Sequence, residues 1–433
     1  MADDNRLRFT PWQALKMTLL LPPLALYVLL KAGLMWLWVR RWRPPAAPAD
    51  DPDRWDVVCL SHVNWRHVWQ RNHHTMSHLA KRSKVLYINT IRLDTYTKHT
   101  PRHKLRFKRV AANIWQCEMF VLPFEMVSPV FQRLNRFLLE ARIKFHMRRL
   151  GFGPVVLWYY FPSHRWLTGR LGERAVVYDI QDEYSQFLWA PRDTAERERQ
   201  LLAEADVVFA GTDALYERKR PMARGGIHFF GCGVDFDLFH NAYNRDKPRD
   251  LHTLRNAVQL GYFGAIDERV DSDLLRYMAE RRPDWDLVLI GPINPAFRVF
   301  AAPNVVFTDQ KPYADLPKFL AFWKVCLMPF AISEMTRHIN PTKALEYFAS
   351  GKPVVSTPIP DMVKHYSDVI YFGETREAFV AACEAALADF PAERRERGLA
   401  LARERSWERV IGEMRRLIDE AIVRRAQREK SGS

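Results

Sequence analysis

The chain has 433 residues, 48% of them hydrophobic and 27% charged, and a formal net charge of +15. This length and composition are enough to bury two ordinary domain cores. The 5 cysteines are odd in number and none forms a Cys-x-x-Cys pair, which argues against a disulfide framework or a zinc site and fits a reducing cytosol. The positive charge favours an anionic partner, which leaves nucleic acid, anionic lipid and phosphate-bearing substrates as candidates.

The N-terminal segment, residues 1–45, is predicted to attach the protein to a membrane. Residues 17–39 are almost wholly apolar, and an arginine-rich cluster follows at residues 40–43. A run of this length can just cross the hydrocarbon core of a bilayer. The arginine cluster would then hold the following domain on the cytoplasmic side, so we expect the protein at the cytoplasmic face of the inner membrane.

Other readings of this segment stay open. Pro22, Pro23 and Lys31 interrupt the apolar run and would allow a kinked re-entrant or interfacial helix with tryptophans at headgroup depth. A cleaved signal peptide fits less well because no small-residue cleavage site follows. A buried core hairpin also fits less well, since tryptophan and arginine bracket the run.

After a short linker rich in proline, alanine and aspartate (residues 44–53), a first domain is expected over residues 54–240. Short β-branched runs alternate there with helical patterns, which favours a parallel sheet covered on both faces. The predicted strands are residues 56–60, 85–89, 154–160, 175–178, 207–210 and 227–230.

Two basic stretches of the first domain suggest an anionic surface as a partner. Residues 98–109 are rich in lysine, arginine and histidine, and residues 131–150 are predicted to form a helix that mixes apolar residues with arginines. Such surfaces attract anionic lipid, although a solvated basic face is the alternative. We find no RNA-binding or zinc-finger pattern, so nucleic acid is not a predicted partner.

A polar stretch at residues 241–253 is predicted to link the first domain to a second one over residues 254–400, and to act as a hinge. The second domain repeats the alternation of strands and helices. Its predicted strands are residues 261–264, 286–291, 304–307, 325–330, 354–357 and 369–372. The sequence therefore predicts an α/β protein of two Rossmann-like domains that face a cleft, with ligands at the carboxyl ends of the strands.

Residues 341–355, PTKALEYFASGKPVV, are the most informative stretch. Lys343 and Glu346 would share one face of a helix, and a helix that begins beside Pro341 offers free N–H groups to an anion. Lys343 is expected to face phosphate oxygens, while Glu346 would accept hydrogen bonds from ribose hydroxyls, which suits a sugar nucleotide. The alternative is an ordinary surface ion pair between residues three apart.

This stretch, together with eight others, resembles the GT-B glycosyltransferases, specifically the retaining family 4. The other segments are YDIQDE at 178–183, ADVV at 205–208, GVD at 233–235, GYFGA at 261–265, LIGP at 289–292, NVVF at 304–307, KPY at 311–313 and LP at 316–317. The resemblance covers residues 55 to 420 and implies the GT-B fold. It also implies that a C-terminal amphipathic helix, residues 406–428, packs back on the first domain.

The resemblance implies a glycosyltransferase that moves a sugar from a nucleoside-diphosphate sugar, of UDP or GDP type, to a lipid-linked glycan in bacterial surface polysaccharide assembly. In such enzymes basic residues neutralise the leaving diphosphate and no metal or other cofactor is needed. Lys343 and Arg269 are the candidates for this role. Gly264 would let the loop approach the diphosphate, and Gly291 would place backbone N–H groups near the base. Arg269 could instead be a solvated loop arginine beside two acids, Asp267 and Glu268.

The sequence departs from the family where many members carry a first glutamate, eight residues before Glu346. His338 stands there, and Glu334 lies four residues further upstream. Asn340, with Pro341 and Thr342, is assigned to the donor site, and the basic character of residues 337–340 would suit a donor sugar that bears a carboxylate. A solvated loop is the alternative. The missing glutamate also leaves open a catalytically silent GT-B-like binding or scaffold module at the membrane, which would bind nucleotide, lipid or a partner enzyme.

The acceptor side is expected in the first domain. His164, in the loop after a predicted strand, and Arg71, in the 70–74 stretch, are the candidates for acceptor contacts. Asp182 and its neighbour Glu183 follow another strand and could orient the acceptor or act as a base. Retention of anomeric configuration is implied by the family alone. If the reaction were inverting, one of these two carboxylates would be the first candidate for the catalytic base.

Overall fold

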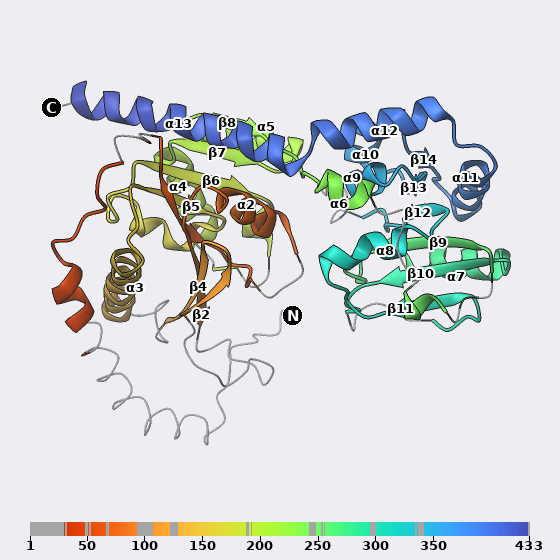
Figure 1. The fold of residues 1–433 in the computed structure, drawn as a ribbon, viewed down its shortest axis with the longest axis horizontal. Coiled ribbons are helices and arrows are strands. Elements are labelled where there is room, and N and C mark those ends of the chain that lie inside the picture. The colour runs from red at the N-terminus through yellow and green to blue at the C-terminus, as the bar shows by residue number, and fades with distance from the viewer. Residues whose placement is uncertain are drawn as a thin grey trace, which may run out of the picture.

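The computed structural model describes residues 30, 33–47, 51, 53–65, 69–92, 107–121, 129–187, 190–191, 193–241, 248–252, 254, 256–294, 300–333, 336 and 342–431. These residues form two lobes, each built on a mostly or wholly parallel sheet with helices around it (Figure 1). The predicted α/β fold of two Rossmann-like domains is confirmed.

The first lobe contains an eight-stranded sheet in the order β3-β4-β2-β1-β5-β6-β7-β8. Neighbouring strands run parallel except for the β3–β4 pair, and the register pairs Val57 of β1 with Val85 of β2. Central strands such as β1 and β5 are buried along their whole length, as expected for strands covered on both faces. The strands are β1 (Asp56–Leu60), β2 (Val85–Arg92), β3 (Phe107–Ala111), β4 (Ile114–Val121), β5 (Val155–Tyr159), β6 (Ala175–Ile180), β7 (Val207–Ala210) and β8 (Ile227–Phe229).

Helices cover both faces of this sheet. One face packs on α2 (Arg71–Leu79), and the other on α3 (Pro129–Arg149) and α4 (Thr194–Glu204). The helix α5 (Asp213–Lys219) follows β7, and its N-cap residue Thr212 accepts a hydrogen bond from the Leu215 N–H. Within the described residues the lobe also has the 3₁₀ turns η2 (Pro162–Leu167), η3 (Tyr184–Gln186) and η4 (Arg220–Met222).

The second lobe contains a six-stranded parallel sheet in the order β11-β10-β9-β12-β13-β14. Its strands are β9 (Val258–Phe263), β10 (Trp285–Ile290), β11 (Val305–Thr308), β12 (Val325–Met328), β13 (Val354–Ser356) and β14 (Tyr371–Phe372). The helices are α6 (Phe236–His240), α7 (Ser272–Arg281), α8 (Leu316–Leu320), α9 (Lys343–Ala349), α10 (Pro360–Tyr366), α11 (Arg376–Ala388) and α12 (Ala392–Glu404), with 3₁₀ turns η5 (Arg249–Leu251) and η6 (Tyr313–Asp315).

The chain enters the second lobe earlier than the predicted boundary at residue 240. Val234 and Phe239, in and just before α6, are buried in the hydrophobic core of the second lobe. Leu251 of η5, inside the predicted linker, is also fully buried there. The lobe boundary therefore falls between β8 and Val234, because apolar side chains from Val234 onward are buried in the core of the second lobe.

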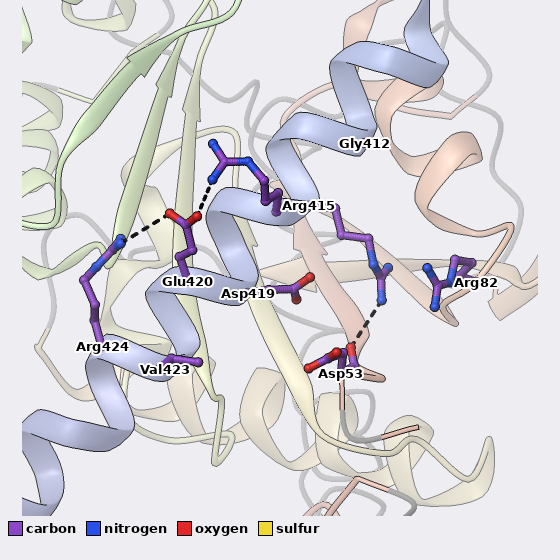
Figure 2. A pocket seen from close by; sticks show the side chains of 9 residues that line it. Asp53, Arg82, Gly412, Arg415, Asp419, Glu420, Val423 and Arg424 are labelled. Carbon is purple, nitrogen blue, oxygen red and sulfur yellow. Dashed lines mark hydrogen bonds and ion pairs between the residues drawn. The ribbon is translucent and has the colours of Figure 1, made fainter. Parts of the chain in front are cut away.

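The last helix, α13 (Trp407–Ser431), returns to the first lobe, where it packs against α2, β6 and β7, while α12 stays on the second lobe (Figure 1). Its apolar face, which includes Met414 and Ile418, is part of the first-lobe core. Polar contacts add to this packing. The Arg415 guanidinium donates to the Asp53 carbonyl (Figure 2). It also lies over the Trp55 ring, and Trp55 Nε1 donates to Asp419.

No helix in the described part of the chain is long and apolar enough to cross a membrane. The predicted membrane segment at residues 17–39 lies mostly outside the described residues. Its last part, residues 33–39, is a short helix beside α3, where Trp36 contacts Phe137 and Trp38 contacts Phe145. Within this helix Leu34 is 70% exposed.

Candidate functional site

A cavity of about 760 Å³ lies between the two lobes, at the carboxyl ends of strands from both sheets. The first lobe contributes the loops after β1, β5, β6 and β7 and the start of α2, while the second contributes the loops after β9, β10, β11 and β12 and the start of α9. Eight residues assigned to the site from the sequence line it: Arg71, Asp182, Gly264, Arg269, Gly291, Thr342, Lys343 and Glu346. Thr342 directly precedes α9.

Lys343 and Glu346 both face this cavity from α9 and are not a surface ion pair. Glu346 is only 6% exposed, and among the described residues neither side chain forms a salt bridge. The Lys343 ammonium lies 5.2 Å from the ring centroids of both Tyr262 and Phe330. Aromatic faces stabilise a cation without neutralising it, so the ammonium keeps its charge for an anionic ligand.

Burial changes the titration of this pair. It lowers the pKa of Lys343, and the nearby charge of Arg269 lowers it further, while Glu346 acts in the opposite direction. Burial raises the pKa of Glu346, and the charge of Lys343 opposes that rise. Two groups whose ionised forms are both disfavoured by burial, on a cavity between lobes, are typical of a binding site for a charged and hydroxylated ligand.

Two glycines make room for the Lys343 side chain. Gly264, at the end of β9, has φ +144, and a Cβ there would lie 2.9 Å from Lys343 Cε. Gly291, at the end of β10, has φ +149, and a Cβ there would lie 1.9 Å from the Gly264 carbonyl oxygen. Only glycine fits at both positions, so the two strand ends can approach each other and leave space beside the lysine.

Arg269 reaches the cavity from the loop after β9 and is held by Asp267. Its Nε lies 2.9 Å from Asp267 Oδ1 and its Nη2 2.5 Å from Asp267 Oδ2, while its backbone N–H also donates to Oδ1. Asp267 does not line the cavity, so it supports the arginine from behind. Asp182 lines the cavity from the first lobe. Burial raises the pKa of Asp182, and the positive charge of Arg269 across the cavity opposes that rise.

Three groups assigned to the site from the sequence are bonded elsewhere or lie outside the cavity lining. The Gly291 N–H donates to the Thr308 carbonyl and so is not available to a base. His164 does not line the cavity, because residues 162–167 form the turn η2, which packs on β5 through the Tyr159 hydroxyl. Glu183 turns away from the cavity and pairs with Lys219.

Arg71 lines the cavity, but its guanidinium is already committed. It lies 3.0 Å from Asp179 Oδ1 and donates to the Phe230 and Gly231 carbonyls where the chain leaves the first lobe. The arginine therefore holds the crossover in place and is not a free acceptor-binding group. Residues 334 and 337–341, which include the predicted site residues Asn340 and Pro341, lie outside the described residues.

The structure also adds site residues that the sequence did not single out. His62 follows β1, contacts the Phe161 and Tyr184 rings, and burial lowers its pKa to about 4. Tyr313 of η6 lies near Glu346 in the cavity. His62 belongs to no recognisable sequence motif. Tyr313 is part of the Lys-Pro-Tyr segment that resembles the family, but that resemblance assigns it no role. Only their positions after strands could have suggested that these two residues belong to the site.

A second hollow of similar volume lies on the outer face of α13, lined by Asp53, Arg82, Gly412, Arg415, Arg416, Asp419, Glu420, Val423 and Arg424 (Figure 2). Its charges pair with one another, since Glu420 is bridged by Arg416 and Arg424. It is formed by one helix and the edge of the first lobe and brings together none of the predicted residues. In the described part of the chain no cluster of three or more His, Cys, Asp or Glu side chains is suited to a metal ion.

Sequence comparisons agree with this geometry. Residues 259–389, which include Gly264, Arg269, Lys343 and Glu346, match the model of the family described as glycosyl transferases group 1. A protein of Bacillus subtilis (strain 168) described as a teichuronic acid biosynthesis glycosyltransferase, TuaH, is 27% identical over 257 residues, which are 53% of this chain and 63% of that protein. The match thus spans less than two thirds of the relative's length.

Solved structures share the fold. Sucrose-phosphate synthase from Thermosynechococcus elongatus superposes with a TM-score of 0.63 at 16% identity and covers 86% of this chain and 100% of its own. A trehalose-6-phosphate structure from E. coli bound with UDP-2-fluoro glucose gives a TM-score of 0.61 at 11% identity, with 85% and 99% covered. At these identities the likeness concerns the fold. The chain has a GT-B-like fold, and its residues 259–389 are similar to the glycosyl transferases of group 1.

Proposed function

We propose that the protein is a glycosyltransferase that moves a sugar from a nucleoside-diphosphate sugar, of UDP or GDP type, to a lipid-linked glycan in bacterial surface polysaccharide assembly. One observation carries the proposal: Lys343, Arg269 and Glu346 line a single cavity between the lobes, at the carboxyl ends of both sheets. The relative named for teichuronic acid biosynthesis supports the polysaccharide setting.

The donor would lie against the second lobe. The ammonium of Lys343 and the guanidinium of Arg269 would bind the diphosphate, and the Glu346 carboxylate would accept hydrogen bonds from ribose hydroxyls. Two cations beside the leaving group supply the electrostatic stabilisation that a bound metal provides in other transferases, so we propose a reaction without a metal cofactor.

In the transfer step the bond between the anomeric carbon and the diphosphate oxygen breaks, and the nucleoside diphosphate leaves with the electron pair. The acceptor hydroxyl oxygen bonds to the anomeric carbon, and its proton passes to the leaving phosphate. This front-face course retains the anomeric configuration and needs no protein nucleophile. In an inverting reaction, Asp182 on the opposite wall would instead take the proton.

The protein would work at the cytoplasmic side of the inner membrane. Three observations support this location: the apolar stretch at residues 17–39, the arginine cluster that follows it, and the exposed apolar side chains of residues 33–39 beside the basic helix α3. Trp36 and Trp38 lie on this surface, and the Arg148 guanidinium stacks 4.1 Å from the Trp38 ring centroid. A surface of this kind would bring the cleft close to a lipid-linked acceptor.

Turnover tests the proposal. The purified full-length protein is incubated with a panel of UDP-, GDP- and other nucleotide sugars and a polyprenyl-pyrophosphate-linked glycan, and release of nucleoside diphosphate is measured. We expect Lys343→Ala or Glu346→Ala to reduce release by at least about a hundredfold, which is roughly 2.7 kcal/mol of lost transition-state stabilisation.

The matched control is Lys324→Ala, which removes an exposed lysine of the same lobe outside the cavity. It should keep wild-type turnover. Nucleotide binding without turnover of any donor would instead support a catalytically silent binding module and end the enzyme proposal.

A further inference from the structure

The two walls of the cavity differ in charge. The wall from the second lobe carries the cations Arg269, Lys311 and Lys343. The wall from the first lobe consists mainly of aromatic rings and uncharged hydrogen-bonding groups: His62, Trp69, Gln70, Asn72, Tyr160, Gln181, Tyr184 and Thr212. The cations thus gather on one side of the space that donor and acceptor must share.

Among the described residues, the first-lobe wall carries two charged side chains, and neither favours an anion. The Arg71 guanidinium is occupied by Asp179 and by two backbone carbonyls. A buried pair of this kind loses several kcal/mol when one partner is removed, so the arginine does not turn to a ligand. The other charged side chain, Asp182, carries a carboxyl group that would repel phosphate.

The uncharged part of this wall suits a ring with hydroxyl groups. The His62 ring lies 5.0 Å from Tyr184 and 5.7 Å from Phe161, so an aromatic cluster stands beside the cavity. The imidazole is neutral at physiological pH because burial lowers its pKa to about 4. A neutral imidazole and amide groups both donate and accept hydrogen bonds, as sugar hydroxyls do.

Asn72 supplies an unused acceptor on the same wall. Its Nδ2 donates to Ser61 Oγ at 3.2 Å and to Tyr87 Oη at 3.0 Å, which fixes the orientation of the amide. Its Oδ1 is buried and has no hydrogen-bond partner among the described residues, although Asn72 lines the cavity. A buried acceptor without a partner is unfavourable, and a hydroxyl donor from a ligand would relieve it.

We propose that the first-lobe wall binds the acceptor as an uncharged, hydroxyl-bearing sugar ring, and that a phosphorylated group does not enter this half of the cavity. This inference rests on the proposed function and specifies its acceptor. The pyrophosphate of the lipid carrier then stays outside the cleft. The acceptor must already bear at least one sugar, which an earlier sugar transfer to the lipid carrier must supply.

Acceptor competition tests the inference. With a donor that the protein turns over, nucleoside diphosphate release is compared for p-nitrophenyl hexosides, the matching hexose 6-phosphates, and polyprenyl phosphate without a sugar. The neutral glycosides should stimulate release at least about tenfold more than either phosphorylated compound, a difference of roughly 1.4 kcal/mol. Preferred use of a hexose phosphate or of bare polyprenyl phosphate would overturn the inference.

Two histidine variants test whether the first-lobe wall binds the acceptor. His62→Ala should raise the acceptor KM about tenfold while the dissociation constant of the nucleoside diphosphate stays unchanged. The matched control His228→Ala removes a partly buried histidine of the first lobe that does not line the cavity, and it should change neither constant. Equal effects of the two substitutions would contradict the assignment.

A measurement of acceptor binding tests the inference even if the protein turns over no donor. Saturation-transfer NMR with UDP or GDP present should detect the neutral glycosides on the wild type and lose them on His62→Ala. Two results would contradict the inference: detection of bound hexose 6-phosphates but not of neutral glycosides, or glycoside binding that persists in His62→Ala. Failure of turnover with His62-dependent glycoside binding would remove only the proposed activity.

Discussion

At the scale of single residues, the donor half of the site depends on a glycine that leaves space for a lysine. The missing Cβ of Gly264 is what allows Lys343 to lie across the end of β9, with its ammonium over two aromatic rings. A lysine on a short helix could face solvent in many ways. Here it is directed into the cavity by the backbone of another strand.

Gly264→Ala should therefore weaken nucleoside diphosphate binding by at least about tenfold, because the added methyl group both strains the backbone and displaces Lys343. Calorimetric titration with UDP and GDP measures the change. Gly169→Ala is the control, since Gly169 also has a positive φ but has nothing within 4 Å of its missing Cβ. Similar losses in both variants would mean that backbone strain alone is responsible.

For the Asp267–Arg269 pair, the direction in which nucleotide affinity changes on removal of Asp267 distinguishes two roles of this carboxylate. Simple electrostatics says that removal of a carboxylate near the phosphate site strengthens binding of an anion. We expect the opposite for Asp267→Ala, a loss of about fivefold, because the bidentate contact fixes the guanidinium that faces the cavity. The loss should disappear in an Arg269→Gln background.

The matched control for this pair is Asp284→Ala. Asp284 binds Arg282 with the same two-residue spacing, but on the exposed surface of the second lobe. Nucleotide affinity should be unchanged in that variant. Tighter binding in Asp267→Ala would show that the carboxylate only opposes the ligand.

The buried lysine also predicts a pH dependence. Burial lowers the pKa of Lys343 below the ordinary 10.5, and phosphate binding needs the protonated ammonium. Nucleotide affinity should thus decline with rising pH at a lower pH than an exposed lysine would allow. Lys343→Arg stays charged throughout this range, so the decline should be shallower. Parallel pH profiles for the two proteins, measured by calorimetry, would count against a role for Lys343.

At the scale of elements, α13 is part of the first lobe although it follows the second in sequence. It begins where the Trp407 N–H donates to the Val234 carbonyl at the crossover, and its apolar face then completes the core beside α2. The first lobe therefore depends on the C-terminal residues of the chain for its stability.

Met414→Ala should lower the stability of the first lobe by about 2–5 kcal/mol, since the side chain is fully buried and its loss leaves a cavity. Gly412→Ala, two positions earlier, has nothing within 4 Å of its missing Cβ and should be neutral or stabilising by up to about 1 kcal/mol. Denaturant unfolding followed by tryptophan fluorescence measures both. A negligible change in Met414→Ala would mean that α13 is not required by the lobe.

Another element, the antiparallel pair β3–β4, was not predicted. Phe107 to Arg109 belong to a stretch that the sequence indicates as a basic run, and among the described strands β3 pairs only with β4, at the edge of the sheet. Edge strands with lysine and arginine lack the apolar pattern that marks a central strand. A basic segment therefore forms a strand here, and the strand is recognised only from its pairing with β4 in the structure.

At the scale of the whole molecule, the exposed apolar surface of residues 33–39 lies on the first lobe, which also supplies the proposed acceptor wall. The double variant Leu34→Glu/Leu37→Glu should reduce sedimentation with vesicles that contain phosphatidylglycerol, because these two side chains are 70% and 55% exposed. Val423→Glu, which changes an exposed apolar side chain of α13, is the control and should sediment as the wild type does. Equal sedimentation of all three proteins would remove this surface from the proposed membrane contact.

The sequence by itself determined the fold class, most strands of both sheets, and the placement of Lys343 and Glu346 on one face of a short helix. These features depend on local pattern: apolar β-branched runs, glycines at strand ends, and the spacing of side chains along one helix turn. Residues 259–389, which hold most of the donor motifs, are also the part that the family model matches.

The tertiary structure alone decided which polar groups are available. Arg71 and the Gly291 N–H were plausible ligand contacts in the sequence, but distant partners, Asp179 and Thr308, already occupy them. His62 joined the site and His164 did not, although both follow strands of the same sheet. Hydrogen bonding and burial are set by residues far apart in the chain, so no local pattern could have distinguished these cases.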